Sequence, residues 1–393
     1  MDDFTPDRSG SVTTPKGFTA AGLAAGIKES GKPDLALVVN NGPLQDAAAV
    51  FTSNRIFAAP VQWSRDVTSD GVLKAVVLNS GGANACTGKE GLADSVKTAV
   101  RVAAGLDCVV TDVAVCSTGL IGVRLPMGQL LSGVDQAVAR LSAQGGPDAA
   151  AAIMTTDTVR KMASYTSPDG WSIGGMAKGA GMLAPALATM LVVLTTDADV
   201  KPLALDKALR QATSVSFDRV DSDGCQSTND SVVLMSSGAS GFAPLPDEFT
   251  TALSAVCLDL AMQLLADAEG SAHDIAITVK NAATEADALE VARSIARNNL
   301  FKCAIFGNDP NWGRVLAAAG TTGAAFEVEN LDVWFNGVQV YRQGGIGEDR
   351  SLVDLSGRQV DVVVNLNHGK QQATVWTNDL TYDYVKENAE YSS

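Results

Sequence analysis

The residues with the clearest potential for chemistry are a threonine, a lysine and a Ser-Thr-Gly turn. Thr189 lies immediately before the apolar run MLVVL, and Lys178 lies in the glycine-rich segment 174–190 around it. The turn Ser117–Gly119 follows another apolar run. A turn of this kind can present a hydroxyl and a backbone N–H together, which is the arrangement that stabilises a developing oxyanion. Because threonine is common in strands and polar turns often end them, the same residues also fit a structural role. The four glycines of the segment suggest a strained backbone held rigid by the strand behind it.

Histidine is scarce, and this restricts the chemistry. Only His273 and His368 occur, so a site of three histidines is excluded and few bases are available for a serine or cysteine nucleophile. We expect His273 to begin a strand and His368, in the turn NHGK, to be exposed. A general base therefore has to come from another kind of group.

The segment Gly81–Gly91, GGANACTGKEG, is the best candidate for a phosphate-binding loop, but its spacing is wrong. Five residues separate Gly82 from Gly88 instead of four, and Glu90 follows Lys89 where a serine or threonine would bind magnesium. A glycine-rich turn is the better interpretation.

Composition indicates a folded protein with a large interior. The chain has 393 residues, of which 46% are hydrophobic and 19% charged, below the roughly 25% charged residues usual in soluble domains. Acidic residues outnumber basic ones by 44 to 29, and the net charge of −15 repels nucleic acids and anionic membranes. Nucleic acid and membrane partners are therefore not expected.

Several observations predict a cytoplasmic protein. The start, MDDFTPDRSG, lacks the basic and apolar regions of a secretion signal, and the nearly apolar run Gly181–Leu194 is too short to span a membrane. The cysteines form no CxxC pair, which predicts small buried side chains in a reducing compartment and no disulfide frame or zinc site. They are Cys86, Cys108, Cys116, Cys225, Cys257 and Cys303.

Apolar runs alternate with segments of helical period throughout, which predicts a mixed α/β or α+β protein with buried strands. Amphipathic helices are expected at 247–268 and 284–299. Strands are expected at 35–39, 74–78, 112–116, 191–194, 231–235, 274–279 and 360–366. No linker between independent domains is evident.

Five motifs follow one another along the chain: NSGGANACTG (79–88), CSTGLIG (116–122), KGAGMLAPALATML (178–191), DGCQSTND (223–230) and FGNDPNWGR (306–314). Together they resemble the ornithine acetyltransferase (glutamate N-acetyltransferase) family of arginine biosynthesis. The resemblance extends from about residue 17 to the C-terminus.

The resemblance implies an α+β fold, a layered αββα sandwich of the self-processing N-terminal-nucleophile kind, made jointly by two fragments. Cleavage between Ala188 and Thr189 would leave an α chain, 1–188, and a β chain, 189–393. Thr189 would then carry a free α-amine, whose pKa of about 7.7–8.0 suits a general base near neutral pH. A histidine-poor protein would acquire its base in this way.

The resemblance also implies roles for individual residues. Thr189 would be the nucleophile, and the Thr118 hydroxyl and Gly119 N–H would form the oxyanion hole. Lys178 would neutralise a substrate carboxylate and Glu269 would meet an ammonium, although a solvated lysine and a solvent-facing helix-end acid also fit these positions. The implied substrate-binding residues are Thr155, Lys178, Thr189, Glu269, Asn388 and Ser393. The last two lie in a polar tail expected to fold over the site.

Two departures from the family pattern bear on the site. Gly82 stands in NSGGAN where the family usually has NSGNAN, and Ser271–His273 replaces the end of the family's EGxTK. The second departure concerns substrate contacts near Glu269 and leaves the nucleophile and oxyanion positions intact.

The implied reaction moves an acetyl group from N-acetylornithine to glutamate through an acetyl-threonine ester. No cofactor and no metal are implied, although acetyl-CoA is a possible second acetyl donor. The fragments are expected to assemble as a heterotetramer, two of each. Two alternatives stay open: an N-terminal-nucleophile hydrolase, such as an aminopeptidase of similar fold, and a non-catalytic amino-acid-binding protein that remains one intact chain.

Overall fold

The computed structural model describes residues 4–184 and 190–390. Ala188, Thr189 and Ser393 therefore lie outside the described residues. Two of the sheets belong to one layered unit, which extends to residue 266 and which we call the sandwich.

The first sheet of the sandwich has the order β1-β2-β4-β5, with β4 and β5 parallel and the other neighbours antiparallel. Its strands are β1 (Phe18–Leu23), β2 (Leu35–Asn40), β4 (Ala75–Asn79) and β5 (Val113–Ser117). The second sheet has the order β3-β9-β8-β7-β6, with β8 and β9 parallel. Its strands are β3 (Asp46–Phe51), β6 (Lys161–Thr166), β7 (Ser172–Lys178), β8 (Leu191–Thr196) and β9 (Ser231–Ser236).

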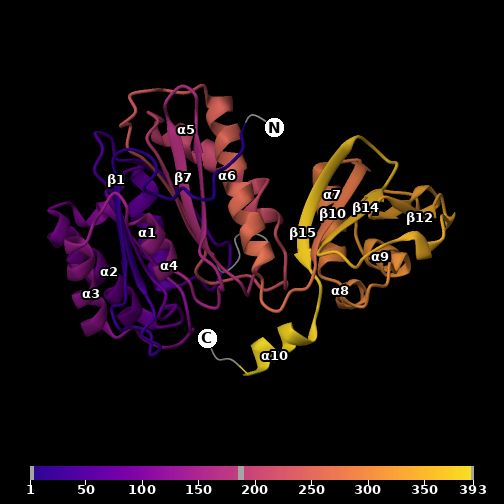
Figure 1. Ribbon diagram of the computed structural model, residues 1–393, viewed down its shortest axis with the longest axis horizontal. Coiled ribbons are helices and arrows are strands. Elements are labelled where there is room, and N and C mark those ends of the chain that lie inside the picture. Colours follow the sequence, from indigo (N-terminus) through magenta and orange to yellow (C-terminus); the bar gives the residue numbers. More distant parts are fainter. Residues whose placement is uncertain (1–3, 185–189, 391–393) are drawn as a thin grey trace.

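The two sheets pack face to face. Val38 and Leu78 of the first share one apolar core with Met176 and Val193 of the second. The outer face of the first sheet packs on α2 (Gly88–Leu106) and α3 (Met127–Ala139), and that of the second packs on α5 (Pro202–Ser214) and α6 (Pro246–Ala266) (Figure 1). Strands such as β2 (LALVVN) and β4 (AVVLN) bury side chains on both faces, and their sequences are therefore almost entirely apolar. The result is the four-layer αββα arrangement.

Shorter helices close the edges of the sandwich. α1 (Ala59–Val67) packs beside β5, and α4 (Gly146–Ala152) packs beside β1, the opposite edge of the first sheet. Single 3-10 turns lie at Thr68–Asp70, Val110–Asp112, Phe217–Arg219, Val328–Asn330 and Arg350–Leu352.

A third sheet forms a separate C-terminal unit with its own core, in the order β13-β12-β11-β14-β10-β15. Its strands are β10 (Asp274–Ala282), β11 (Asp332–Phe335), β12 (Val338–Arg342), β13 (Gly345–Ile346), β14 (Gln359–Asn365) and β15 (Gln371–Asn378). The helices of this unit are α7 (Glu285–Ala296), α8 (Asn299–Phe306) and α9 (Trp312–Ala319).

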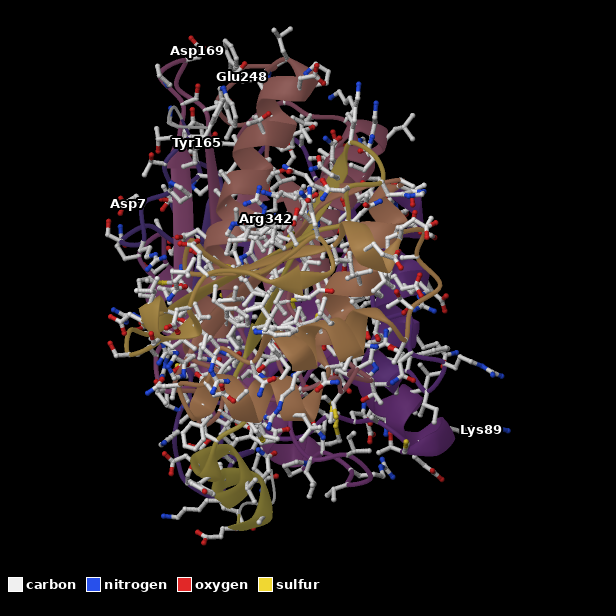
Figure 2. The ribbon with its side chains drawn as sticks, turned by 90° about the vertical axis from the view of Figure 1, so that its right-hand side faces the viewer. Asp7, Lys89, Tyr165, Asp169, Glu248 and Arg342 are labelled. Atoms are coloured by element: carbon white, nitrogen blue, oxygen red, sulfur yellow. The ribbon has the colours of Figure 1, made fainter. Side chains whose placement is uncertain are left out.

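The chain then returns to the sandwich. After β15 it forms α10 (Tyr382–Glu390), which lies below both units and reaches back toward the sandwich (Figures 1 and 2). This return brings the last part of the sequence close to residues that precede it by more than 100 positions.

All seven predicted strands and both predicted helices are present within the described residues. The predicted mixed fold is confirmed, but the αββα layers account only for the sandwich, and the C-terminal unit was not anticipated. α6 is long and apolar enough, by length and composition, to cross a membrane. Phe249, Val256 and Leu260 of α6 lie in the sandwich core, which identifies it as a half-buried core helix.

Two predictions about residue types were wrong in part. The predicted backbone strain is not found at Gly174 and Gly175, because both lie within β7 and pair with both neighbouring strands. A Cβ at Gly174 would lie 2.1 Å from the Ser11 carbonyl oxygen, so this glycine permits close packing. The cysteines are not uniformly buried: Cys116 and Cys257 are, whereas Cys86, Cys225 and Cys303 are exposed.

Candidate active site

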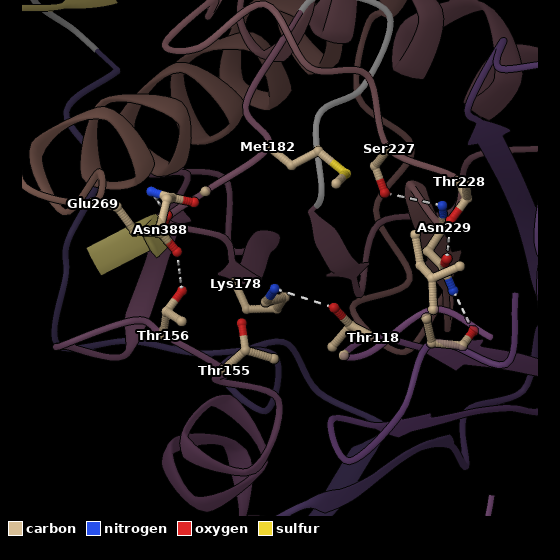
Figure 3. A pocket seen from close by; sticks show the side chains of 14 residues that line it. Thr118, Thr155, Thr156, Lys178, Met182, Ser227, Thr228, Asn229, Glu269 and Asn388 are labelled. Carbon is tan, nitrogen blue, oxygen red and sulfur yellow. Dashed lines mark hydrogen bonds between the residues drawn. The ribbon is translucent and has the colours of Figure 1, made fainter. Parts of the chain in front are cut away.

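One cavity of about 130 Å³ brings together every predicted site residue that the structure describes (Figure 3). The residues come from separate parts of the chain: the turn after β5, the loop before β6, the end of β7, the turn after α6, and α10. They are Thr118, Gly119, Thr155, Lys178, Glu269 and Asn388. Thr189 and Ser393, predicted for the same site, lie outside the described residues.

The turn after β5 supplies the hydroxyl and the N–H expected of an oxyanion site. Thr118 is 1% exposed; its N–H donates to the Asn79 carbonyl and its carbonyl accepts from the Gly82 N–H, both at 3.0 Å. Gly119 has φ +128°, and a Cβ there would lie 2.8 Å from Gly82 N. In the described part of the chain the Gly119 N–H has no hydrogen-bond partner, so it is available to a ligand.

The segment 81–91, considered above for phosphate binding, instead builds the wall beside this turn. Gly82 and Ala83 both donate to the turn through their N–H groups, and Asn229 ties the wall together by donating to the carbonyls of Ala83 (2.6 Å) and Ser117 (2.8 Å). Lys89 points away from the body of the molecule into solvent (Figure 2). Residues 81–87 form the predicted turn, whereas residues 88–91 are the start of α2.

Lys178 is the most deeply buried charged group at the cavity, with an exposed fraction of 1%. Its Nζ donates to the Thr118 Oγ1 at 3.2 Å (Figure 3). Burial lowers the pKa of Lys178, and the negative charge of Asp157 opposes that lowering.

Asp157 is held by several donors at once. Its Oδ1 accepts from the Gly179 N–H at 2.7 Å and from Lys161 Nζ at 2.6 Å, and its Oδ2 accepts from the Thr155 N–H at 2.9 Å. Lys161 also pairs with Asp267 at 2.6 Å. Burial of Asp157 disfavours its ionised form, but the charges of Lys178 and Lys161 outweigh this and lower the pKa of Asp157 to about 2. Asp157 is thus a permanent carboxylate beside the cavity.

Glu269 forms the opposite wall. Its Oε1 accepts from the Thr156 hydroxyl at 2.7 Å, and its Oε2 accepts from Asn388 Nδ2 at 3.0 Å (Figure 3). The first contact fixes the carboxylate on the loop before β6, and the second fixes it on α10. A fixed carboxylate at a cavity suits a substrate ammonium.

Asp230 lies where the described chain resumes after residue 189. Its Oδ1 accepts from the Met190 N–H at 3.1 Å, and burial raises the pKa of Asp230 well above its usual value. The Asp230 carboxyl thus fixes the start of β8. The first residue of β8, Leu191, pairs with Lys178 at the end of β7.

The residues near Glu269 that depart from the family pattern do not line the cavity. The N–H groups of Ala272 and His273 donate to Asp379, and the Ser271 hydroxyl accepts from Arg358. His273 is buried immediately before β10, with Nδ1 2.7 Å from the Asp379 carboxylate. His368 is exposed. Both expectations for the histidines are confirmed.

Sequence reasoning missed several residues of the cavity, among them Thr156, Asn229 and the supporting Asp157. Thr156 and Asp157 could have been suspected because they directly follow Thr155 in TTDT. Asn229 carried no such signal, because its amide acts on backbone carbonyls that only the fold brings near. In residues 4–184 and 190–390 no group of three or more His, Cys, Asp and Glu side chains could hold a metal ion.

One wall of the cavity carries a hydroxyl and an N–H that has no partner among the described residues, with a buried ammonium beside them. The opposite wall carries a fixed carboxylate. These groups can stabilise the oxyanion of an acyl-transfer reaction and bind its substrate. This site on this layered fold defines the chain as an acyltransferase. The ArgJ family model matches residues 19–393, and the chain belongs to the ArgJ family.

Relatives match over nearly the whole chain. The arginine biosynthesis bifunctional protein ArgJ of Streptomyces avermitilis is 64% identical over 383 residues, covering 98% of this chain and 100% of that protein. The protein of the same name from Thermobifida fusca is 60% identical over 383 residues with the same coverage.

Solved structures were also found. A crystal structure of ornithine acetyltransferase from Mycobacterium tuberculosis, complexed with ornithine, is 54% identical, covers 47% of this chain and 98% of its own, and has a TM-score of 0.46. A structure of the Bacillus halodurans protein ArgJ is 36% identical, covers 50% and 97%, and has a TM-score of 0.48.

Proposed function

We propose that this chain transfers the acetyl group of N2-acetylornithine to glutamate, giving ornithine and N-acetylglutamate in arginine biosynthesis. The observation that carries the proposal is the convergence of Thr118, Gly119, Thr155, Lys178, Glu269 and Asn388 on one cavity. Full-length relatives named arginine biosynthesis bifunctional protein and a solved ornithine acetyltransferase with bound ornithine support it.

The enzyme matures by cutting itself between Ala188 and Thr189. The Thr189 hydroxyl oxygen attacks the Ala188 carbonyl carbon, the peptide C–N bond breaks, and the nitrogen gains a proton to become the α-amine of Thr189. Water then hydrolyses the ester, which frees the hydroxyl and leaves a carboxylate on Ala188. The fragments 1–188 and 189–393 stay together because they share the five-stranded sheet, in which β7 of the first pairs with β8 of the second.

Transfer proceeds in two steps. The Thr189 oxygen attacks the acetyl carbonyl, its proton passes to its own α-amine, and the oxyanion accepts hydrogen bonds from the Thr118 hydroxyl and the Gly119 N–H. Collapse breaks the acetyl C–N bond, and ornithine leaves with that proton. The neutral amine of glutamate then attacks the acetyl ester, the α-amine shuttles the proton back to the Thr189 oxygen, and N-acetylglutamate leaves.

The charged groups of the cavity suit a substrate that carries both an ammonium and a carboxylate. Glu269 offers its carboxylate to the ammonium, between Thr156 and Asn388. Lys178 supplies positive charge between Glu269 and Thr118, beside Thr155 (Figure 3). Ser393 is included as a further substrate-binding residue on the family resemblance alone.

Two further features rest on the family. Acetyl-CoA loads the same threonine in a second activity, as the name bifunctional suggests for the relatives. The paired fragments assemble as a heterotetramer, two of each.

The decisive experiment combines intact-mass measurement with an acetyl-transfer assay. We expect two polypeptides, the first ending at Ala188, and sustained release of ornithine, with formation of N-acetylglutamate, only when glutamate is present. Thr189→Ala should abolish both cleavage and transfer, because it removes the oxygen used in each. An active, uncut chain would overturn the proposal, and acetate release that does not depend on glutamate would indicate a hydrolase.

A further inference from the structure

The contact between Lys178 and Thr118 determines which way the Thr118 hydroxyl can donate. An ammonium has three donors and no acceptor, so in this 3.2 Å contact Thr118 Oγ1 accepts. The Thr118 hydroxyl proton must therefore point elsewhere. Among the described residues no hydrogen bond donated by that hydroxyl is found, and both side chains line the cavity.

We propose that Lys178 is a positioning residue of the oxyanion site: its ammonium turns the Thr118 hydroxyl proton into the cavity, and the Asp157 carboxylate keeps that ammonium charged. This inference rests on the proposed function. It gives Lys178 a role in stabilising the transition state, in addition to any contact with the substrate.

The charge on Lys178 requires support because the side chain is almost fully enclosed. Burial lowers the pKa of Lys178, and Asp157 is the largest influence in the opposite direction. Five charged or titratable groups from different elements interact electrostatically with Lys178. They are Asp157 of the loop before β6, Lys161 of β6, Asp230 just before β9, Glu269 of the turn after α6 and Lys28 of the loop after β1.

Asp157 is well suited to this support because it cannot be protonated under ordinary conditions. Lys161, the Thr155 N–H and the Gly179 N–H all donate to its carboxylate, and its side chain is fully buried. The Gly179 contact also fixes the residue directly after Lys178. Asp157 therefore acts on Lys178 through both charge and backbone position.

Loss of the Lys178 proton would reverse the contact. A neutral amine has a lone pair that accepts from the Thr118 hydroxyl, and the oxyanion would lose that donor. The kcat of transfer should therefore fall at alkaline pH as Lys178 deprotonates. The acid limb belongs to a different group, the α-amine of Thr189, which must be neutral to accept a proton.

The test is the pH profile of kcat for acetyl transfer, measured on the full-length, processed enzyme. Asp157→Asn removes the negative charge and keeps an acceptor, so Lys178 loses its proton more easily. We expect the alkaline limb to move to lower pH by about one unit or more, while the acid limb stays in place. Asp332→Asn is the matched control, because Asp332 is a buried carboxylate in the C-terminal unit; it should move neither limb.

Lys178→Arg distinguishes this role from a merely structural one. Arginine stays protonated throughout the accessible range, so the alkaline limb should disappear in this variant even if kcat is lower. Asp157→Asn should then cause no alkaline shift when added to Lys178→Arg.

Two results would overturn the inference. One is an alkaline limb in Asp157→Asn that coincides with that of the unaltered enzyme. The other is a Lys178→Met variant whose KM rises while kcat is unchanged, which would limit Lys178 to substrate binding. Absence of transfer in the unaltered enzyme would instead refute the proposed function, and normal cleavage of each variant shows that it has folded.

Discussion

Two lysines on neighbouring strands of the five-stranded sheet differ in what surrounds them. Lys161 begins β6 and Lys178 ends β7, and the exposed fraction of each is 1% or less. Lys161 lies 2.6 Å from each of two carboxylates, Asp157 and Asp267. Among the described residues Lys178 has no ion pair, and its ammonium donates to a hydroxyl at the cavity.

The difference separates a structural charge from a functional one. A buried ion with carboxylates on both sides has its desolvation offset locally, and removing one member leaves the others uncompensated. A buried ion without such a partner is costly to the fold and is available to a ligand. In the sequence Lys161 is followed by Met162 and Ala163, and Lys178 is preceded by the same two residue types. Their different roles are set by the partners that the fold brings to each lysine.

The largest expected effect comes from Lys161→Met. This change leaves Asp157 and Asp267 buried without their cation, and we expect the free energy of unfolding to fall by about 3–5 kcal/mol. Denaturant unfolding measures it. Lys201→Met is the matched control: Lys201 also faces two carboxylates, Asp46 and Asp199, but its side chain is 64% exposed. That change should cost far less, because an exposed ion pair that is screened by water contributes little to stability. Equal losses in the two variants would refute the distinction.

Next in size is the effect of Thr118→Val, which tests the cavity side of the comparison. It removes the hydroxyl that Lys178 orients and keeps the shape of the side chain. Loss of one oxyanion donor lowers kcat by about 10²–10³-fold, so we expect a drop of this size with KM little changed. Steady-state kinetics measure it. Thr118→Ser should retain most of the activity, and a Val variant with near-normal turnover would remove Thr118 from the mechanism.

A smaller effect, opposite in sign to that of Lys161, is expected from Lys178→Met. Methionine has a similar volume and no charge to desolvate, so the free energy of unfolding should stay the same or rise by about 1 kcal/mol. The same denaturant titration measures this change. A clear loss of stability would mean that Lys178, like Lys161, serves mainly the fold.

Much of the fold could be predicted from the sequence because buried strands are visible in it as short apolar runs. Runs such as LALVVN of β2 and LVVLTT of β8 are apolar on both faces and cannot be mistaken for loops. The separate C-terminal unit could not be predicted, because its strands have the same composition as those of the sandwich. Short strands such as β12 and β13, with exposed residues, lack a continuous apolar run.

The site was predictable where a motif carries the chemistry. Thr118, Lys178 and Glu269 stand in recognisable motifs, and the structure brings them to one cavity. The supporting groups were not predictable, because their roles depend on distant partners. Asp157 acts on Gly179, 22 positions away, and Asn229 acts on Ala83, 146 positions away. Such contacts leave no pattern in local spacing.

The smallest expected effect is that of replacing Asn388. It extends the comparison from the two lysines to the carboxylate of Glu269 and the groups that hold it. Glu269 is held on one side by Thr156, within the sandwich, and on the other by Asn388 of α10, which is exposed. A hydrogen bond that is accessible to water contributes about 0.5–1.5 kcal/mol, so Asn388→Ala should raise the KM for N-acetylornithine about 2–10-fold with little change in kcat. Thr156→Val should raise it more, because its partner oxygen then loses a less accessible donor. If Asn388→Ala had the larger effect, α10 would contribute more to holding the substrate than the sandwich does.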